Sequence, residues 1–327
     1  MQKNELIPQL FKTEYRKIIA VLCKLFGFEY VEIAEDITND TFLLATETWS
    51  LKGIPENPTA WLYIVAKNKT RDYFKRNKIF KEKIFFVLQH QQIDVDEIEL
   101  NLSNENISDS QLQMMFAICH PIIPVESQIG LALRILCGFG IDEIADAFLS
   151  NKDTINKRLF RAKEKLRTEN IKIELPNNNE IEQRLETILT TLYLLFNEGY
   201  YSATQNTSLQ KELCFEAMRL TNLLIENKHT NKPIVNALMS LMCFHASRFD
   251  ARLNEIGESI LYEEQNRDLW NDELIAKGNY FLIESAKGNE VSKYHLEASI
   301  AYWHATKIEY DHKWENILQL YNKLLLV

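Results

Sequence analysis

The amino-acid sequence predicts an all-α protein with more than one domain. Only 9 Gly and 7 Pro occur in 327 residues, so few positions interrupt a helix. Apolar residues recur at intervals of three and four, which is the period of an amphipathic helix. The length is sufficient for two or three domains. A hydrophobic content of 46% with 25% charged residues is typical of a soluble globular protein.

The N-terminal part of the sequence begins with two predicted amphipathic helices. The apolar positions of the first are Phe11, Tyr15, Ile18, Ile19, Leu22 and Leu25. The second covers residues 32–49, with apolar Ile33, Ile37, Phe42, Leu44 and Ala45. Its polar face is acidic and includes Glu32, Glu35, Asp36 and Asp40.

A third helix is predicted over residues 60–78, after a turn with Pro55 and Pro58, and Thr59 is its expected N-cap. Its aromatic residues Trp61, Tyr63, Tyr73 and Phe74 are interleaved with Lys67, Asn68, Lys69, Arg71, Lys75 and Arg76. Rings that stack on bases and cations that hold phosphates are used to bind single-stranded DNA. In the alternative, Trp61 and Ile64 pack the helix onto its neighbours. The two interpretations of Trp61 are equally supported, whereas packing is favoured for Tyr73 and Phe74.

Two segments have the composition of linkers. Residues 94–109 are acidic, contain no basic residue and are rich in Asn and Ser, which indicates a flexible tether. A second boundary is expected at residues 176–179, Pro-Asn-Asn-Asn. The sequence between these boundaries becomes basic again at residues 151–167, and the sequence after them is acidic and helical.

Residues 141–167 have the pattern of a helix-turn-helix. Ile144, Ala145 and Phe148 supply the packing face of a short first helix. In the second, Ile155, Leu159, Ala162 and Leu166 recur at i, i+4, i+7 and i+11. The opposite face holds Thr154, Lys157, Arg158, Arg161 and Lys165. Because the chain has a net charge of −9, a basic helix indicates a partner such as DNA phosphate. A solvated basic face is the plainer alternative.

The turn between these two helices departs from the common pattern. Leu149 stands where many helix-turn-helix motifs have a left-handed Gly, and a residue other than Gly is strained there. Asp153 is the expected N-cap of the second helix.

Several classes of function have no support in the sequence. No run of about 18 apolar residues predicts a membrane span, and the charged N-terminus does not resemble a signal peptide. The five cysteines, Cys23, Cys119, Cys137, Cys214 and Cys243, form no CxxC pair, so neither zinc nor another metal is expected. Reduced thiols in a cytoplasmic protein are the expected state. No catalytic constellation is found, and no cofactor is expected.

Residues 10–170 resemble a bacterial RNA polymerase sigma factor of the extracytoplasmic-function type. The stretch AEDITNDTFLLATETW is similar to the helix that docks on the polymerase clamp, and NPTAWLYIVAKNKTRDYFKR to the helix that melts the promoter and reads its −10 element. The acidic tether and the helix-turn-helix resemble the linker and the −35-reading fourth domain of that family.

The resemblance implies a role for each region. Residues 1–90 would form sigma domain 2, residues 91–110 an acidic flexible linker, and residues 111–175 sigma domain 4. Core RNA polymerase would bind Glu35, Asp36, Asp40 and Phe42. The melted −10 strand would bind Trp61, Tyr63, Lys67, Asn68, Arg71, Lys75 and Arg76. The −35 element, as double-stranded promoter DNA, would bind Thr154, Lys157, Arg158, Arg161 and Lys165. In this interpretation the chain initiates transcription but is not itself an enzyme.

Residues 180–327 resemble a C-terminal helical extension found in a subgroup of this family and described as TPR-like. The resemblance rests on LYLLFNEGYYSA, ELCFEAMRL and HASRFDARLNEIGESILYEEQNRDLWN. It implies that the extension contacts the sigma domains and controls them in cis. Gly199 is an expected helix C-cap. The favoured interpretation of this segment is a helix end at which Glu198 is hydrogen-bonded. In the alternative, a polar pocket comprises Asn197, Glu198, Tyr200, Arg219, Arg248 and Arg252.

Two alternatives stay open. The chain could be a helix-turn-helix transcription regulator that does not melt promoters, although the acidic docking helix and the aromatic-basic helix argue against this. It could also be a sigma factor fused to a domain that binds or converts a small molecule. A ligand-sized pocket with convergent charges and shifted pKa values would favour this second alternative.

Overall fold

The computed structural model describes residues 3–76, 100–201, 207–252, 254, 260–307 and 311–326. Every regular element within these ranges is a helix, so the prediction of an all-α fold is confirmed. The chain divides into two compact units. Unit 1 comprises residues 1–118, 130–140 and 157–175, and unit 2 comprises residues 119–129, 141–156 and 176–327.

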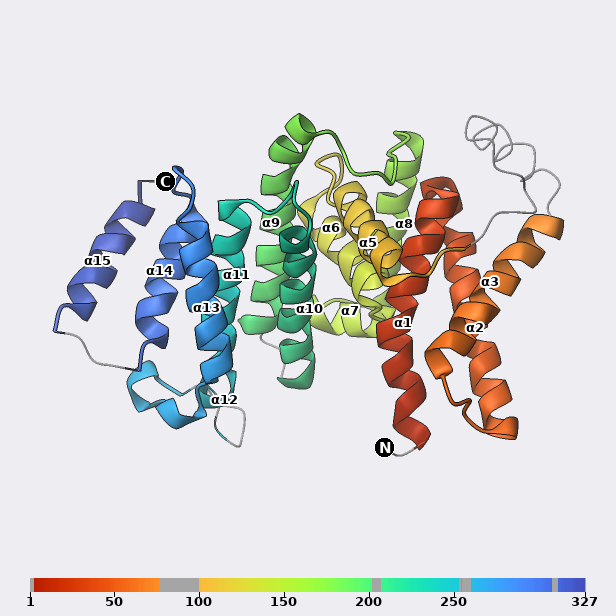
Figure 1. Cartoon of the computed structure of the whole chain (residues 1–327), viewed down its shortest axis with the longest axis horizontal. Helices are drawn as coiled ribbons and strands as arrows, with labels where there is room; N and C mark the ends of the chain where they lie inside the picture. Colours follow the sequence, from red (N-terminus) through yellow and green to blue (C-terminus); the bar gives the residue numbers. More distant parts are fainter. Residues whose placement is uncertain are drawn as a thin grey trace. The chain divides into compact units, whose positions relative to one another are not determined.

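Unit 1 is built around its N-terminal helix, α1. Its elements are α1 (Lys3–Phe26), η1 (Phe28–Tyr30), α2 (Val31–Lys52), α3 (Pro58–Arg76), α5 (Asn104–Ile118), the π-helical turn η4 (Ala132–Cys137) and the larger part of α8 (Lys152–Thr168). Helix α1 packs against α2, α3 and α5 (Figure 1), and it also contacts η4. Its residues Tyr15, Ile18, Ile19 and Leu22 are fully buried, as the amphipathic pattern predicts. Cys23 is also fully buried, because α1 is covered on more than one side.

Turn η4 ends at a glycine that the packing requires. Gly138 has a φ of 77°, and a Cβ atom there would lie 3.1 Å from the carbonyl oxygen of Lys12 in α1. Its N–H donates to the carbonyl of Leu133. The left-handed conformation therefore ends the turn and lets the backbone approach α1.

Helix α5 begins inside the segment predicted as a flexible linker over residues 91–110. The helix starts at Asn104, where the hydroxyl of Ser103 accepts from the N–H of Asn106 at 3.3 Å. Ile107 and Ser110 are buried within the unit. Residues 104–110 thus belong to a helix rather than to a flexible linker, because tertiary burial outweighs their low helix propensity. Residues 91–99 lie outside the described residues.

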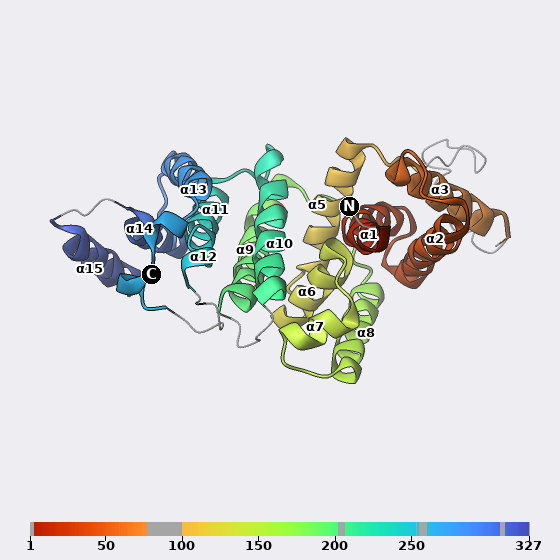
Figure 2. The same ribbon diagram turned by 90° about the horizontal axis from the view of Figure 1, so that it is seen from below.

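Unit 2 holds the remaining helices. They are most of α6 (Val125–Leu131), α7 (Ile141–Ala147), the start of α8, α9 (Asn178–Tyr200), α10 (Thr207–Glu226), α11 (Pro233–Ala246), α12 (Phe249–Arg252), η5 (Tyr262–Glu264), η6 (Arg267–Leu269), α13 (Asp272–Ser285), α14 (Lys293–Ala305) and α15 (Lys313–Leu324). Helix α9 packs on α10, α10 on α11, α11 on α13 and α14, and α14 on α15 (Figure 2).

Helix α11 lies at the centre of this row because it is apolar on all sides. Val235, Leu238 and Met242 are fully buried, and a helix with no polar face is stable only when it is covered. Gly278 of α13 permits the close approach, since a Cβ atom there would lie 2.6 Å from the Phe244 ring. The hydroxyl of Ser240 donates to the carbonyl of Gly278 at 2.8 Å.

Candidate functional site

Helix α3 presents a polar face at helical spacing. The helix starts at Pro58 and is capped by Asn57, whose side-chain oxygen accepts from the N–H of Ala60 at 2.9 Å. The predicted cap, Thr59, is therefore wrong, because Pro58 already occupies the first helical position. Exposed side chains on this helix include Ile64, Asn68, Arg71, Lys75 and Arg76. Residues 64, 68, 71 and 75 follow one another at intervals of three and four and so lie on one face.

Three further residues predicted to read the −10 strand are less accessible. Trp61 is half-buried, with its ring edge-on to that of Trp49 at 5.3 Å. Lys67 is half-buried as well. The hydroxyl of Tyr63 donates to Glu14 Oε2 at 2.7 Å. Burial and this bond raise the pKa of Tyr63 well above its usual range. Tyr63 thus stabilises the contact of α3 with α1, and its hydroxyl is not available to a base.

The acidic face of α2 is divided between exposed and buried residues. Asp36 and Asp40 are exposed, and Asp40 pairs with Lys69 at 3.2 Å. Phe42 is 4% exposed, and its ring lies 4.9 Å from that of Phe11 in α1. Its assignment to the polymerase-binding face is therefore wrong, because α1 covers the side of α2 on which it stands.

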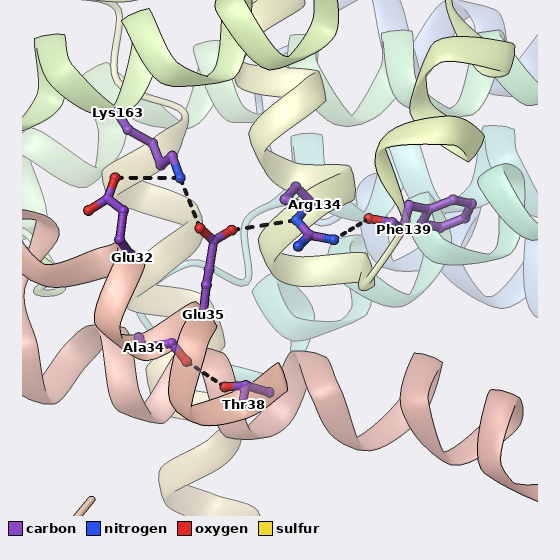
Figure 3. A network of polar contacts seen from close by, with 7 residues as sticks. All are labelled: Glu32, Ala34, Glu35, Thr38, Arg134, Phe139 and Lys163. Atoms are coloured by element: carbon purple, nitrogen blue, oxygen red, sulfur yellow. Dashed lines mark hydrogen bonds and ion pairs between the residues drawn. The ribbon is translucent and has the colours of Figure 1, made fainter. Parts of the chain in front are cut away.

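Glu35 lies in a network of ion pairs within unit 1. Its carboxylate accepts from Lys163 of α8 at 2.9 Å and lies 3.5 Å from Arg134 Nε of η4 (Figure 3). Lys163 also lies 3.6 Å from Glu32, and Arg134 donates to the carbonyl of Phe139. Only about one sixth of the Lys163 and Glu35 side chains is exposed (16% and 15%). Glu35 thus connects its own helix, α2, with η4 and α8, which are about 100 or more residues away in the sequence.

Sequence reasoning missed three exposed residues of α2. Leu43 is 58% exposed and Leu44 is 37% exposed, although the pattern assigned Leu44 to the apolar core. Glu47 is exposed as well. Residues 36, 40, 43 and 47 follow one another at intervals of four, three and four, so they lie on one face of the helix. This spacing is visible in the sequence and could have predicted the exposed face. These four residues, Asp36, Asp40, Leu43 and Glu47, form an exposed acidic stripe on the helix.

The turn between α7 and α8 has the left-handed residue that is common in helix-turn-helix motifs, although that residue is Leu149 rather than Gly. Leu149 has a φ of 47°, and the N–H of Ser150 donates to the carbonyl of Ala145 at 2.8 Å, which is the pattern of a Schellman motif. Helix α8 is capped by Asn151, whose side chain accepts from the N–H of Thr154 at 2.8 Å. The prediction of Asp153 as the cap is wrong, since the helix begins one residue earlier, at Lys152.

Helix α8 separates its apolar and basic residues as expected. Ile155, Leu159, Ala162 and Leu166 are each at most 4% exposed. Thr154, Lys157, Arg161 and Lys165 are exposed, and Arg158 is half-buried. Lys165 pairs with Glu169 at 2.7 Å. The exposed cations form a face that a phosphate backbone or base edges could reach.

The polar pocket predicted in the C-terminal half is only partly correct. Tyr200 is buried at 6%, and the Arg252 guanidinium stacks on its ring at 3.7 Å. Asn197 and Glu198 are half-buried, and burial raises the pKa of Glu198. Arg219 pairs with Glu216 of its own helix at 2.8 Å. Helix α9 continues through Gly199 to Tyr200, so Gly199 is not a C-cap.

Of the residues predicted for the pocket, only Arg248 lines a cavity that is found among the described residues. The cavity has a volume of about 420 Å³ and lies within unit 2. Its walls also include His245 and Tyr262, neither of which was predicted for the pocket. No sequence motif signals this cavity, because its residues come from several helices.

Two further findings concern the described residues as a group. All five cysteines are buried and free of disulfides, and no cluster of three His, Cys, Asp or Glu side chains among the described residues is placed to hold a metal ion. Within the described ranges no helix has both the length and the apolar character needed to cross a membrane.

The comparison with protein families decides the identity of the N-terminal region. Residues 10–79, which contain α2, α3 and most of α1, match sigma-70 region 2. The chain belongs to the sigma-70 family. Region 2 implies that this sigma-70 family protein binds core RNA polymerase and recognises promoter DNA.

Other matches extend over the rest of this sigma-70 family protein. Residues 184–286 match a family of unknown function, DUF6596. Over 302 residues the chain is 30% identical to the uncharacterized protein R00370 of Rhizobium meliloti (strain 1021), which covers 91% of this chain and 70% of that protein. The two therefore belong to one family along most of their length. No solved structure matches the chain.

Proposed function

We propose that this protein is an extracytoplasmic-function sigma factor that reads a −10 element with α3 and a −35 element with α8. The observation that carries the proposal is the exposed face of α3, with Ile64, Asn68, Arg71 and Lys75, inside the segment that matches region 2. The exposed cations of α8 supply a second DNA-binding face in a chain with a net charge of −9. Residues 1–90 and 111–175 would be the two DNA-binding domains.

Core RNA polymerase would bind the acidic stripe of α2. Asp36, Asp40 and Glu47 are exposed, and Leu43 adds an apolar contact at 58% exposure. Charged rims with an apolar centre are common at protein interfaces. Glu35 is a weaker candidate because its carboxylate already pairs with Lys163 and Arg134.

The C-terminal extension, residues 180–327, would act in cis as a TPR-like helical domain. Support comes from unit 2, in which the hydroxyl of Thr191 in α9 donates to Gln128 Oε1 at 2.7 Å, and both groups are buried. The side chain of Gln128 also donates to the carbonyls of His120 and Ile123. Through Gln128, the extension would thereby be bonded to residues 120–128, which precede the helix-turn-helix.

Run-off transcription with purified core polymerase tests the proposal. The complete chain should direct initiation at a discrete start site, and Arg71→Ala should reduce the yield. A helix-turn-helix regulator of the alternative type would bind duplex DNA but give no transcript with core polymerase alone, and that result would overturn the proposal.

A point substitution tests control in cis without truncating the chain. Thr191→Val removes the bond to Gln128 and should change the transcript yield in either direction. Gln183→Ala, at an exposed position of the same helix, is the matched control. Equal yields for the two variants and the unmodified chain, with Thr191→Val still folded, would count against control through this contact.

A further inference from the structure

The cavity of unit 2 is lined by five helical segments, by the residue after α9 and by one residue between α11 and α12. It is lined by Tyr193 of α9 and by Tyr201, by Leu241 and His245 of α11, by Arg248, by Tyr262 of η5, by Glu297, Ile300, Ala301 and His304 of α14, and by Tyr321 and Leu324 of α15. Its volume of about 420 Å³ falls in the range of roughly 300–1,000 Å³ that is usual for small-molecule sites. The cavity is therefore large enough for a small organic molecule.

Arg248 is a cation on the cavity wall without a carboxylate partner among the described residues. Its Nη2 donates to the hydroxyl of Tyr200 at 3.3 Å, and its guanidinium carbon lies 5.5 Å from the centre of the Tyr262 ring. Its Nε is buried and has no hydrogen-bond partner in the described structure. A buried N–H donor without an acceptor is costly, and an anion bound in the cavity would satisfy it.

The surroundings of Arg248 are electropositive. Lys313 is 2% exposed and donates to the hydroxyl of Tyr262 at 2.8 Å. Burial, followed by the charge of Arg248, lowers the pKa of His245 to about 3 and that of His304 to about 4. Both imidazoles are therefore neutral at pH 7, and Nδ1 of His245 has no partner among the described groups. Glu297 is the carboxyl group among the residues that line the cavity, and burial raises its pKa.

The remaining walls favour a planar ligand. The phenol rings of Tyr193, Tyr201, Tyr262 and Tyr321 line the space, and Leu241 and Ile300 add apolar surface. Aromatic rings contact other rings favourably by stacking or edge-on packing. A guanidinium recognises a carboxylate through paired N–H donors.

We propose that this cavity is a binding site for a small aromatic carboxylate, with the carboxylate on Arg248 and the ring among the tyrosines. His245 and the phenol hydroxyls would orient polar groups on the ring. The site belongs to the part of the chain that matches DUF6596 and its continuation to α15. Its occupancy is independent of whether the chain acts as a sigma factor, so binding can be measured without transcription.

The test uses calorimetric titration of the complete chain with defined probes. Benzoate and indole-3-acetate carry the proposed combination of ring and carboxylate. Benzamide lacks the charge, and cyclohexanecarboxylate lacks the planar ring. We expect at least one aromatic carboxylate to bind, and the neutral amide and the non-planar acid to bind roughly tenfold more weakly or not at all.

Two variants locate the bound probe. Arg248→Met should weaken binding by about tenfold or more. Ala301→Leu narrows the cavity while Arg248 is retained, and it should have the same effect. Lys277→Ala removes an exposed cation of α13 that pairs with Glu273 and should leave the affinity unchanged. Circular dichroism of each variant shows whether it is folded.

The proposal is overturned if neither aromatic carboxylate binds with a Kd below about 1 mM. It is also overturned if benzamide binds as well as benzoate, or if binding survives the folded Ala301→Leu variant. If Arg248→Met does not fold, binding to the Ala301→Leu variant decides whether the probe occupies the cavity.

Discussion

Lys163 Nζ of α8 donates to Glu35 Oε2 of α2 at 2.9 Å, across 128 positions of sequence. The pair links the helix whose opposite face is proposed to read the −35 element to the helix proposed to bind polymerase. With 16% and 15% of the two side chains exposed, the pair is screened less than a surface ion pair. It therefore contributes to the packing of unit 1.

Lys163→Met should lower the free energy of unfolding by about 1–3 kcal/mol, because it leaves the half-buried carboxylate of Glu35 with Arg134 as its remaining cation. Urea denaturation measures the change, and a double-mutant cycle with Glu35→Gln isolates the coupling. Lys165→Met is the control, since Lys165 pairs with Glu169 at the surface and should contribute less than about 1 kcal/mol. Equal losses for both lysines would contradict a special role for Lys163.

Polymerase binding should depend on the exposed carboxylates of α2. Asp36→Ala and Asp40→Ala should each weaken binding to core polymerase by roughly two- to fivefold, mainly by slowing association, and less at high salt. Glu35→Gln should instead lower stability. Surface plasmon resonance at two ionic strengths separates these effects. An affinity loss confined to Glu35→Gln would show that the assignment of the face is wrong.

Binding to the −35 element should depend on the exposed cations of α8. Arg161→Ala should cost about 1–3 kcal/mol if the guanidinium reaches a base edge, and less if it contacts phosphate alone. Fluorescence anisotropy with a promoter duplex that supports run-off transcription measures the change. Arg167→Ala is a suitable control because Arg167 pairs with Glu164 on its own helix. No difference between these two variants would remove Arg161 from the recognition face.

Promoter opening should depend on the exposed face of α3. Asn68→Ala and Arg71→Ala should reduce permanganate reactivity of thymines near the start site more than they reduce duplex binding. Tyr63→Phe removes the bond to buried Glu14 and should lower stability by about 1–3 kcal/mol, while opening continues. If Tyr63→Phe abolishes opening in a folded protein, the division of α3 into a reading face and a packing face is incorrect.

Acid should destabilise unit 2 through His245. Its pKa is lowered to about 3 in the folded state by burial and by Arg248, Arg252 and His304, whereas an unfolded histidine titrates near 6.5. The unfolded state therefore binds the proton first as the pH falls from about 7 toward 3, and stability is lost across that interval.

His245→Gln should reduce the loss of unfolding free energy between pH 7 and pH 5 by about 1–2 kcal/mol. Urea denaturation at the two pH values measures it. His312→Gln, at a side chain that is 76% exposed, is the control. Identical pH dependence in the His245 variant and the unmodified chain would contradict the burial of a neutral imidazole.

The sequence alone determined the features that depend on local order. The apolar stripe of α8, from Ile155 to Leu166, was predicted correctly, because the helical period is set by neighbouring residues. The all-α class followed for the same reason. The two helix caps were each displaced by two residues, to Asn57 and Asn151, since several adjacent polar residues are competent caps.

Tertiary structure decided which face of each helix is covered. Phe42 and Tyr63 were assigned to binding faces, but contacts with α1 bury Phe42 and engage the Tyr63 hydroxyl, and Leu43 is exposed in their place. The ion pair of Glu35 with Lys163 and the cavity around Arg248 could not be predicted from the sequence either. Both depend on residues from distant segments, and pairing at long range is set by how helices pack rather than by local periodicity.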